Sequence, residues 1–220
     1  MFVGHFALGF AAKRATPRVS LAVLFLAALL ADIIWPILVA AGIETVRIVP
    51  GITVVTPLEF VSYPYSHSLV ALVLWGLVMG ALVQWFSGGR AVFAIIAGLV
   101  ISHWLLDFVT HRPDMPIYPG GATYGLSLWN SLPWTLVVEL AMFAAGVWLY
   151  VSTTRPLDGI GRWSLVALTM FLLIAYVGNL AGGAPPSVAA IYGAGLAGGA
   201  ITLVWSWWTD RHRATVSTRA

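Results

Sequence analysis

Charged residues are scarce in this sequence. Only 9% of its 220 residues are Asp, Glu, Lys or Arg, whereas 60% are hydrophobic. Soluble domains carry about 25% charged residues, so the composition excludes an ordinary soluble domain and indicates an integral membrane protein. At this length, a single compact helical domain is the simplest arrangement.

Cysteine is absent. Its absence excludes a disulfide framework, a thiolate metal site and a cysteine nucleophile. The formal net charge is +3, but the basic residues are scattered between the apolar segments. We therefore interpret the positive charge as a signal of membrane topology, and we expect no nucleic-acid partner.

Long apolar runs divide the chain into membrane spans, each of which needs about 20 residues. Six segments qualify: residues 19–42, 66–86, 91–110, 133–152, 163–181 and 187–208. Residues 1–12 are apolar but too short to cross, and we expect them to form a half-length helix that dips into the membrane with His5 near its buried end. We also expect Pro36 to kink the first span one turn after Asp32.

The predicted fold is an all-α membrane protein with six transmembrane helices and this N-terminal half-helix. Residues 1–208 are predicted to form one transmembrane domain, whose site-bearing part is residues 1–132, and residues 209–220 to form a disordered cytoplasmic tail. The connections at 43–65 and 111–132 are long and partly apolar. We expect them to pack together as a cap over the bundle.

The distribution of basic residues predicts the orientation of the spans. If the N-terminus is cytoplasmic, nine of the eleven Lys and Arg residues fall on the cytoplasmic side, and only Arg47 and Arg112 fall outside. Cytoplasmic connections of membrane proteins carry an excess of basic residues. We therefore predict that both termini are cytoplasmic.

Acidic residues lie inside the predicted spans with no Lys or Arg among them. They are Asp32, Asp107 and Glu139. A carboxylate at the bilayer centre costs roughly 3 kcal/mol, so it is kept where it has a partner or a function. Because every basic residue lies in a connection or a tail, the sequence predicts a bound metal ion or a proton as the partner. Glu139 has no histidine at helical spacing, and its role stays open.

Histidines at helical spacing indicate a metal site. His103, Asp107 and His111 are four residues apart, which places their side chains on one helix face. The direction of the spans brings Asp32 and His67 to the same outer half of the membrane. Imidazole nitrogen and carboxylate oxygen suit zinc, or iron or manganese in a more oxygen-rich site. The candidate metal ligands are His5, Asp32, His67, His103, Asp107 and His111.

Six candidates exceed one tetrahedral shell, so we expect one or two ions, with Asp107 shared if there are two. Paired metals about 4 Å apart activate water and stabilise both oxygens of an in-line displacement at phosphorus. Two other interpretations stay open. Asp32 and Asp107 can be protonated members of a proton relay, or a closed four-ligand shell can simply hold the helices together.

Several short motifs carry a resemblance to a known family. They are Gly4-His5-Phe6, Ala12-Lys13-Arg14-Ala15, Leu30-Ala31-Asp32, Ser66-His67-Ser68-Leu69, and Ser102-His103 followed by Asp107 and Thr110. Together they resemble the YdjM-like family of bacterial membrane-bound metal-dependent hydrolases over the first half of the chain. The resemblance implies a multi-pass protein of the bacterial cytoplasmic (inner) membrane. Where the family commonly has a second acid and then a histidine after the first aspartate, this chain has Ile34 and Trp35.

The order of the candidate ligands also resembles that of zinc-dependent phospholipase C and related single-strand nucleases. On that pattern, one zinc would take His5 and Asp107, and another would take Asp32, His67, His103 and Asp107. The further His-x3-Glu element that a third metal needs is absent. This likeness implies a phosphoester substrate, phospholipid head groups included, although analogy of this kind does not fix a function.

We therefore predict a metal-dependent hydrolase of a small-molecule or lipid-linked phosphoester, with membrane lipid and the substrate as its partners and one or two zinc ions as its cofactor. The predicted catalytic residues are Asp32, His67, His103 and Asp107. Arg112 is predicted to bind substrate phosphate, but Arg47 and Arg112 can instead pair with Glu44 and Asp114. The alternatives are a transporter of protons or metal ions, and a non-catalytic membrane protein with a structural metal site.

Reporter fusions test the predicted topology. A reporter fused after Ala220 is expected to report the cytoplasm and one inserted near Gly120 the outside, because nine of the eleven basic residues then face inward. The measurement is the activity of alkaline phosphatase and the fluorescence of green fluorescent protein at both positions. An external C-terminus would contradict the prediction and move the candidate site to the cytoplasmic side.

Overall fold

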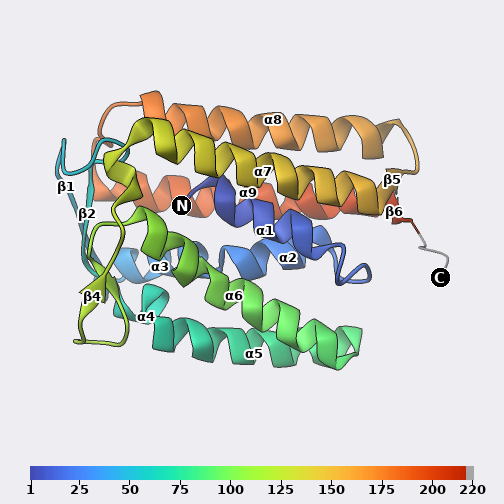
Figure 1. Cartoon of the computed structure of the whole chain (residues 1–220), viewed down its shortest axis with the longest axis horizontal. Coiled ribbons are helices and arrows are strands. Elements are labelled where there is room, and N and C mark those ends of the chain that lie inside the picture. The colour runs from blue at the N-terminus through green and yellow to red at the C-terminus, as the bar shows by residue number, and fades with distance from the viewer. Residues whose placement is uncertain (217–220) are drawn as a thin grey trace.

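The computed structural model describes residues 1–216 of the chain (Figure 1). Its helices are α1 (Val3–Ala12), α2 (Leu21–Ala28), α3 (Leu30–Ala40), α4 (Pro64–His67), α5 (Leu69–Ser87), α6 (Arg90–Thr110), the 3-10 helix η1 (Leu128–Asn130), α7 (Leu132–Thr153), α8 (Gly159–Ala181) and α9 (Val188–Arg211). Three antiparallel strand pairs lie at the ends of the bundle: β1 (Thr45–Ile48) with β2 (Leu58–Ser62), β3 (Met115–Pro116) with β4 (Thr123–Tyr124), and β5 (Thr154–Pro156) with β6 (Arg213–Thr215).

The long helices confirm the predicted multi-pass helical fold. The helices α5 to α9 are each 19 to 24 residues long and apolar enough to cross a membrane. The pair α2 and α3 adds a sixth span if the two helices count as one. Helix α1 is short and apolar, as expected for the half-length helix, and it lies inside the bundle between α7 and α2 (Figure 1).

The first span is broken at Leu29, so the expected kink after Pro36 is wrong in position. Helices α2 and α3 meet at 59°, whereas α3 continues through Pro36 to Ala40. The physical reason lies in the site: the Ala28 carbonyl accepts a hydrogen bond of 2.8 Å from His103 Nδ1. A side chain that takes a carbonyl from the helical ladder is one of the ordinary causes of a sharp bend.

Polar caps mark where four of the apolar helices begin. Ser20, Ser68, Asp158 and Ser187 precede α2, α5, α8 and α9, and each side chain accepts a hydrogen bond from the backbone N–H three residues later. These caps satisfy backbone donors that the first helical turn leaves unpaired. The capping residues therefore determine where these helices begin, which the apolar sequence by itself does not.

Close packing between α1 and α7 positions the half-length helix. A Cβ atom at Gly146 of α7 would lie 2.3 Å from the backbone oxygen of Ala7. Beside this contact, the Phe10 ring of α1 packs edge-on against Phe25, with ring centroids 4.8 Å apart. Small residues allow membrane helices to approach this closely.

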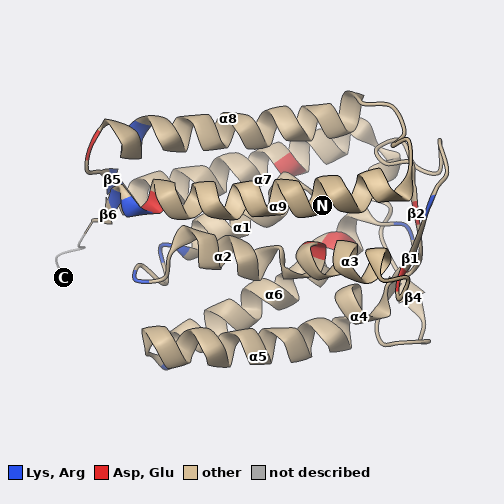
Figure 2. Ribbon diagram, turned by 180° about the vertical axis from the view of Figure 1, so that it is seen from behind, with Lys and Arg blue, Asp and Glu red and all other residues tan. Residues whose placement is uncertain are grey.

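The two long connections pack together as the predicted cap. The backbone N–H groups of Val54 and Val55 both donate to the Trp129 carbonyl, at 3.2 Å each. The ring of Phe60 on β2 stacks on Trp129, with centroids 6.4 Å apart. Both connections cover the same end of the bundle, and the candidate site lies beneath them (Figure 2).

The opposite end of the bundle is held by a buried ion pair. Lys13 Nζ lies 2.6 Å from Asp210 Oδ2, and the Tyr150 hydroxyl donates to Asp210 Oδ1 at 2.7 Å. This contact explains why residues 209–216 are ordered, contrary to the disordered tail predicted for 209–220: α9 extends past Asp210, and β6 then pairs with β5. Residues 217–220 of that predicted tail lie outside the described residues. Most Lys and Arg residues lie at this end (Figure 2).

Substitution of Gly146 tests the packing of α1. Gly146→Ala is expected to lower the free energy of unfolding by about 1–3 kcal/mol, because the new methyl group meets the backbone of Ala7. Gly98→Ala is the matched control, since a Cβ atom there meets nothing within 4 Å. Thermal unfolding of both variants in detergent is the measurement, and equal melting temperatures would contradict the packing argument.

Candidate metal centre

The structure brings all six predicted metal ligands together in the half of the bundle beneath the cap. They are His5 of α1, Asp32 of α3, His67 of α4, His103 and Asp107 of α6, and His111 directly after α6. All of them except Asp32 are buried. The fifth histidine, His212, lies at the other end and pairs with Asp158. The predicted convergence of these residues is therefore observed, whereas their roles as ligands stay predictions.

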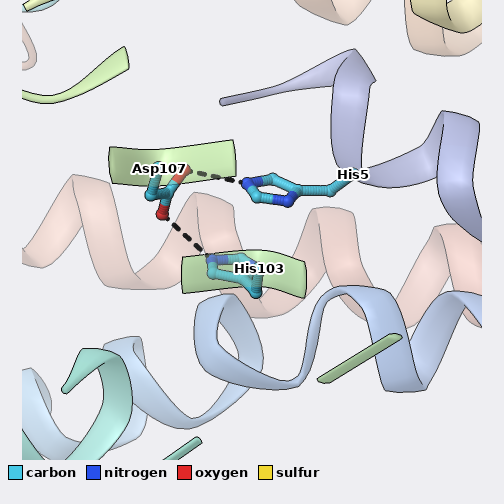
Figure 3. Close-up of side chains that lie close together, drawn as sticks. All are labelled: His5, His103 and Asp107. Carbon is cyan, nitrogen blue, oxygen red and sulfur yellow. Dashed lines mark hydrogen bonds and ion pairs between the residues drawn. The ribbon is translucent and has the colours of Figure 1, made fainter. Parts of the chain in front are cut away.

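The Asp107 carboxylate lies at the centre of the cluster. One of its oxygens, Oδ1, is 3.0 Å from His5 Nε2. The other, Oδ2, is 3.2 Å from His103 Nε2, 3.8 Å from His111 Nε2 and 3.9 Å from His67 Nε2. Figure 3 shows His5 and His103 reaching Asp107 from two sides, and their rings stack with centroids 3.8 Å apart.

Asp32 completes a second group of donor atoms. Its Oδ1 lies 3.6 Å from His67 Nε2 and 3.7 Å from His103 Nε2. Adjacent donor atoms around a tetrahedral zinc ion lie about 3.4 Å apart, given zinc–nitrogen distances of about 2.0–2.1 Å. The donor atoms of Asp32, His67 and His103 all lie within 4.8 Å of one another, as do those of His5, His103 and Asp107. Either group has the spacing to hold a metal ion.

His103 belongs to both groups, and its Nδ1 is already bonded. A carbonyl oxygen only accepts, so the Nδ1 of His103 donates to Ala28, and its Nε2 is the nitrogen that faces the two carboxylates. This buried Nε2 lies 3.2 Å from Asp107 Oδ2 and 3.7 Å from Asp32 Oδ1. A neutral Nε2 presents a lone pair that a metal ion between the carboxylates would accept, whereas a protonated Nε2 donates to a carboxylate directly. Because Nδ1 is occupied, His103 can serve only one metal, so the expected pair of metals sharing Asp107 would have to divide the remaining ligands.

The orientation of His67 depends on Ser66 and Glu44, to which the sequence had assigned no role at the site. Ser66 Oγ donates to Glu44 Oε2 at 2.6 Å, so the same oxygen accepts from His67 Nδ1 at 2.7 Å. Glu44 is buried and also accepts from the backbone N–H groups of Tyr65 and Ser66. This chain of bonds leaves His67 Nε2 with its lone pair toward the cluster. Carboxylate groups commonly orient metal-bound histidines in this way.

His111 is oriented by Asp114. Its Nδ1 donates to Asp114 Oδ1 at 3.0 Å, and the Tyr63 hydroxyl donates to the same oxygen at 3.0 Å. Burial lowers the pKa of His111 and raises that of Tyr63, so near neutral pH the imidazole is uncharged and the phenol keeps its proton. Arg112, the predicted phosphate ligand, pairs with Asp114 Oδ2 at 3.5 Å. Arg47 pairs with Glu59 instead of Glu44, at 3.6 Å.

Glu139 anchors the start of α1. Its Oε2 accepts hydrogen bonds from the backbone N–H groups of Phe2 at 2.8 Å and Gly4 at 3.2 Å. The Met1 amino group contacts Asp107 Oδ1. A buried carboxylate is a strong acceptor for the unpaired N–H groups at a helix N-terminus. The sequence shows Glu139 as an acid inside a span with no basic or histidine neighbour. Its spacing could not predict that its partners are the backbone N–H groups of α1.

The site opens to a cavity at one residue of the cluster. The Asp32 side chain is 44% exposed, whereas that of His67 is 4% exposed and those of His103 and Asp107 are 1% and 3% exposed. Asp32 lines a cavity of about 630 Å³ that is bounded by α3, α8, α9 and the underside of the cap. A ligand in this cavity would reach the cluster on the Asp32 side.

These features define a multi-pass helical membrane protein with a buried histidine and aspartate site. The chain belongs to the YdjM inner membrane protein family, whose model matches residues 1–182 and so includes all six candidate ligands. The protein is therefore located in the inner membrane, as the motifs implied. No curated protein and no solved structure matches the chain.

Metal analysis of histidine variants tests the site. Purified protein is expected to bind zinc, and His103→Ala is expected to lose it, because Nε2 of His103 lies in both donor groups. His212→Ala is the matched control, since His212 pairs with Asp158 away from the cluster. Ser66→Ala is expected to weaken zinc binding roughly 10–100-fold by releasing His67.

The measurements are the zinc content by elemental analysis and the zinc affinity by calorimetry. Native protein that carries no metal before or after soaking in zinc would contradict the site. Equal zinc retention by His103→Ala and His212→Ala would show that the ligands lie elsewhere.

Proposed function

We propose that this protein is a membrane-embedded hydrolase that uses a divalent metal, zinc first among them, to cleave a phosphoester. The observation that carries the proposal is that the ligand cluster is buried on all sides except at Asp32, which faces a cavity. Structural zinc sites are closed by four protein ligands, whereas catalytic sites keep a position open for water or substrate.

The residues divide into holding and orienting roles. Asp32, His67, His103 and Asp107 would hold the metal, and His5 and His111 would support it from opposite ends of the Asp107 carboxylate. When bound, a divalent metal lowers the pKa of water and offsets the charge on phosphoryl oxygens. The hydrogen bonds from His103 to Ala28 and from His67 to Ser66 keep both imidazoles aimed at one position.

The phosphoester class rests on the ligand set. Histidines mixed with carboxylates, more numerous than one metal shell needs, are similar in order to the ligands of zinc-dependent phospholipase C. The distribution of basic residues favours an outer-leaflet position for the site, so the substrate would be met at the outer face of the inner membrane. Arg112 could reach a bound phosphate only by giving up its pairing with Asp114.

A transporter function is less well supported. Conduction needs a polar path through both halves of the membrane. Beyond the site, the interior is filled by aromatic rings: Phe10 packs against Phe25, Phe143 and Tyr150, with centroids 4.8, 6.0 and 5.3 Å apart. The pair formed by Lys13 and Asp210 follows at the far end.

Hydrolysis by purified protein tests the proposal. Zinc-loaded protein in detergent is expected to cleave at least one member of a panel of phosphomonoesters, phosphodiesters and phospholipids, and chelation is expected to abolish the cleavage. Asp32→Ala is expected to lower the rate by at least about 100-fold, since loss of even a supporting residue costs about 10–100-fold. Asp158→Ala, an acid at the other end of the bundle, is the matched control.

Three outcomes discriminate between the candidate functions. Chelator-sensitive cleavage that Asp32→Ala lacks and Asp158→Ala keeps would support the hydrolase. A zinc-loaded protein that cleaves nothing but conducts protons or metal ions in liposomes would replace the hydrolase with a transporter. A zinc-loaded protein that does neither would indicate a structural metal.

A further inference from the structure

The cavity beside Asp32 extends away from the metal ligands into a largely apolar space. From Asp32 and Glu139 it runs between α8 and α9 and under the cap. Helix α8 lines it with Phe171, Leu172 and Ala175, and α9 lines it with alanine and glycine residues around Gly198. Its volume of about 630 Å³ lies within the range of roughly 300–1,000 Å³ that is usual for small-molecule sites.

Glycines on α9 create this space. Gly195 and Gly199 face α3, where Cβ atoms would lie 3.7 Å from Pro36 and 3.8 Å from Ile33 in ordinary contact. These two glycines form the close-packing face expected from the sequence. A Cβ atom at Gly198, by contrast, would meet nothing within 4 Å, and Gly198 lines the cavity. Gly198 therefore leaves space on the cavity side of α9 that a larger side chain would occupy.

Two residues of the cavity wall carry buried hydrogen-bond donors. The indole Nε1 of Trp35 and the hydroxyl of Tyr176 have no partner within the described part of the chain. Their side chains are both in the cavity wall, as is Asp32. Buried donors are rarely left unpaired in a native protein, so each of these two needs an acceptor oxygen, from an ordered water or from a ligand. Phosphate oxygens next to a metal-holding carboxylate would meet that need.

The walls of the cavity belong to helices that face the bilayer. On their outer sides, Ile174 of α8 and Val204 of α9 are exposed, as expected for lipid-facing positions. A molecule that is already in the membrane would reach this cavity from the lipid that surrounds these helices. A water-soluble ester has no apolar group that could contact the apolar walls of the cavity.

We propose that this cavity binds a membrane phospholipid, with an acyl chain along Gly198 between α8 and α9 and the phosphate toward Asp32, Trp35 and Tyr176. The assignment of this lipid as the substrate rests on the proposed hydrolase function. The binding site itself does not, because its apolar walls and its unpaired donors are independent of the reaction.

A photoactivatable phospholipid measures occupancy without turnover. Zinc-loaded, full-length protein in phosphatidylcholine vesicles is irradiated with a non-cleavable phosphonate analogue of phosphatidylglycerol that carries a diazirine in its acyl chain, and the labelled peptides are mapped by mass spectrometry. Labelling is expected at Ala175 and Ala194, which line the cavity. Gly198→Leu is expected to reduce it severalfold, because the leucine side chain enters the space that the acyl chain would fill.

Gly193→Leu is the matched control. It introduces the same side chain on the same helix, at a position where a Cβ atom also meets nothing within 4 Å, but Gly193 is not part of the cavity wall. Circular dichroism checks that both variants fold. Equal labelling of Ala175 and Ala194 in the two variants would overturn the proposal.

Tyr176→Phe separates head-group recognition from chain binding. This variant removes only the unpaired hydroxyl. It is expected to weaken retention of phosphatidylglycerol, measured by native mass spectrometry, and to leave retention of diacylglycerol, which lacks the phosphate, unaltered. Equal effects on both lipids would exclude a phosphate partner for Tyr176.

Activity assays distinguish failure of the lipid site from failure of the proposed reaction. If the protein hydrolyses esters, Gly198→Leu is expected to lower cleavage of a long-chain phospholipid more than cleavage of p-nitrophenyl phosphate. Absence of any cleavage together with labelling that depends on Gly198 would keep the lipid site and remove the hydrolase. Cleavage of p-nitrophenyl phosphate together with labelling that does not depend on Gly198 would keep the hydrolase and remove the lipid site.

Discussion

The compensation of the buried Asp107 carboxylate is the constraint on which the arrangement of this protein depends. Four histidines from three separate segments of the chain lie within 3.9 Å of its two oxygens. No arginine or lysine side chain lies near it among the described residues, and the Met1 amino group is the other cation that contacts it; an unpaired charge at this depth is strongly unfavourable. Helices α1, α4 and α6 must therefore meet at one place, and their packing follows from that requirement.

The half-length helix α1 is the least self-sufficient part of the fold. It cannot cross the membrane, so the backbone groups at its buried end need partners from elsewhere. Glu139 supplies them at one end, and Gly146 allows α7 to lie against the backbone of Ala7. One helix, α7, thus both anchors and packs the segment that carries His5. The family match over residues 1–182 includes α7 together with the ligand-bearing helices.

Much of the fold and the ligand set could be predicted from the sequence, because both depend on local patterns. Apolar runs determine the spans, and the four-residue spacing of His103 and Asp107 determines a shared helix face. Features that depend on contacts between distant segments could not be predicted. The break at Leu29 is accompanied by a hydrogen bond from His103 to the Ala28 carbonyl. The contact of Glu44 with Ser66 forms only when the cap folds against the start of α4. Gly198 borders the cavity, whereas Gly195 and Gly199 pack against α3, and the sequence alone does not tell these two kinds of glycine apart.

The bend between α2 and α3 has a consequence for the order in which the protein matures. The carbonyl released at Ala28 is bonded by His103, which is 75 residues later in the chain. During synthesis, the first span therefore enters the membrane before the group that stabilises its bend exists. Asp32 acquires its final position only when α6 has been inserted, so a partly synthesised chain presents no complete ligand set. Assembly of the histidine and aspartate cluster is in this way tied to completion of the first half of the bundle.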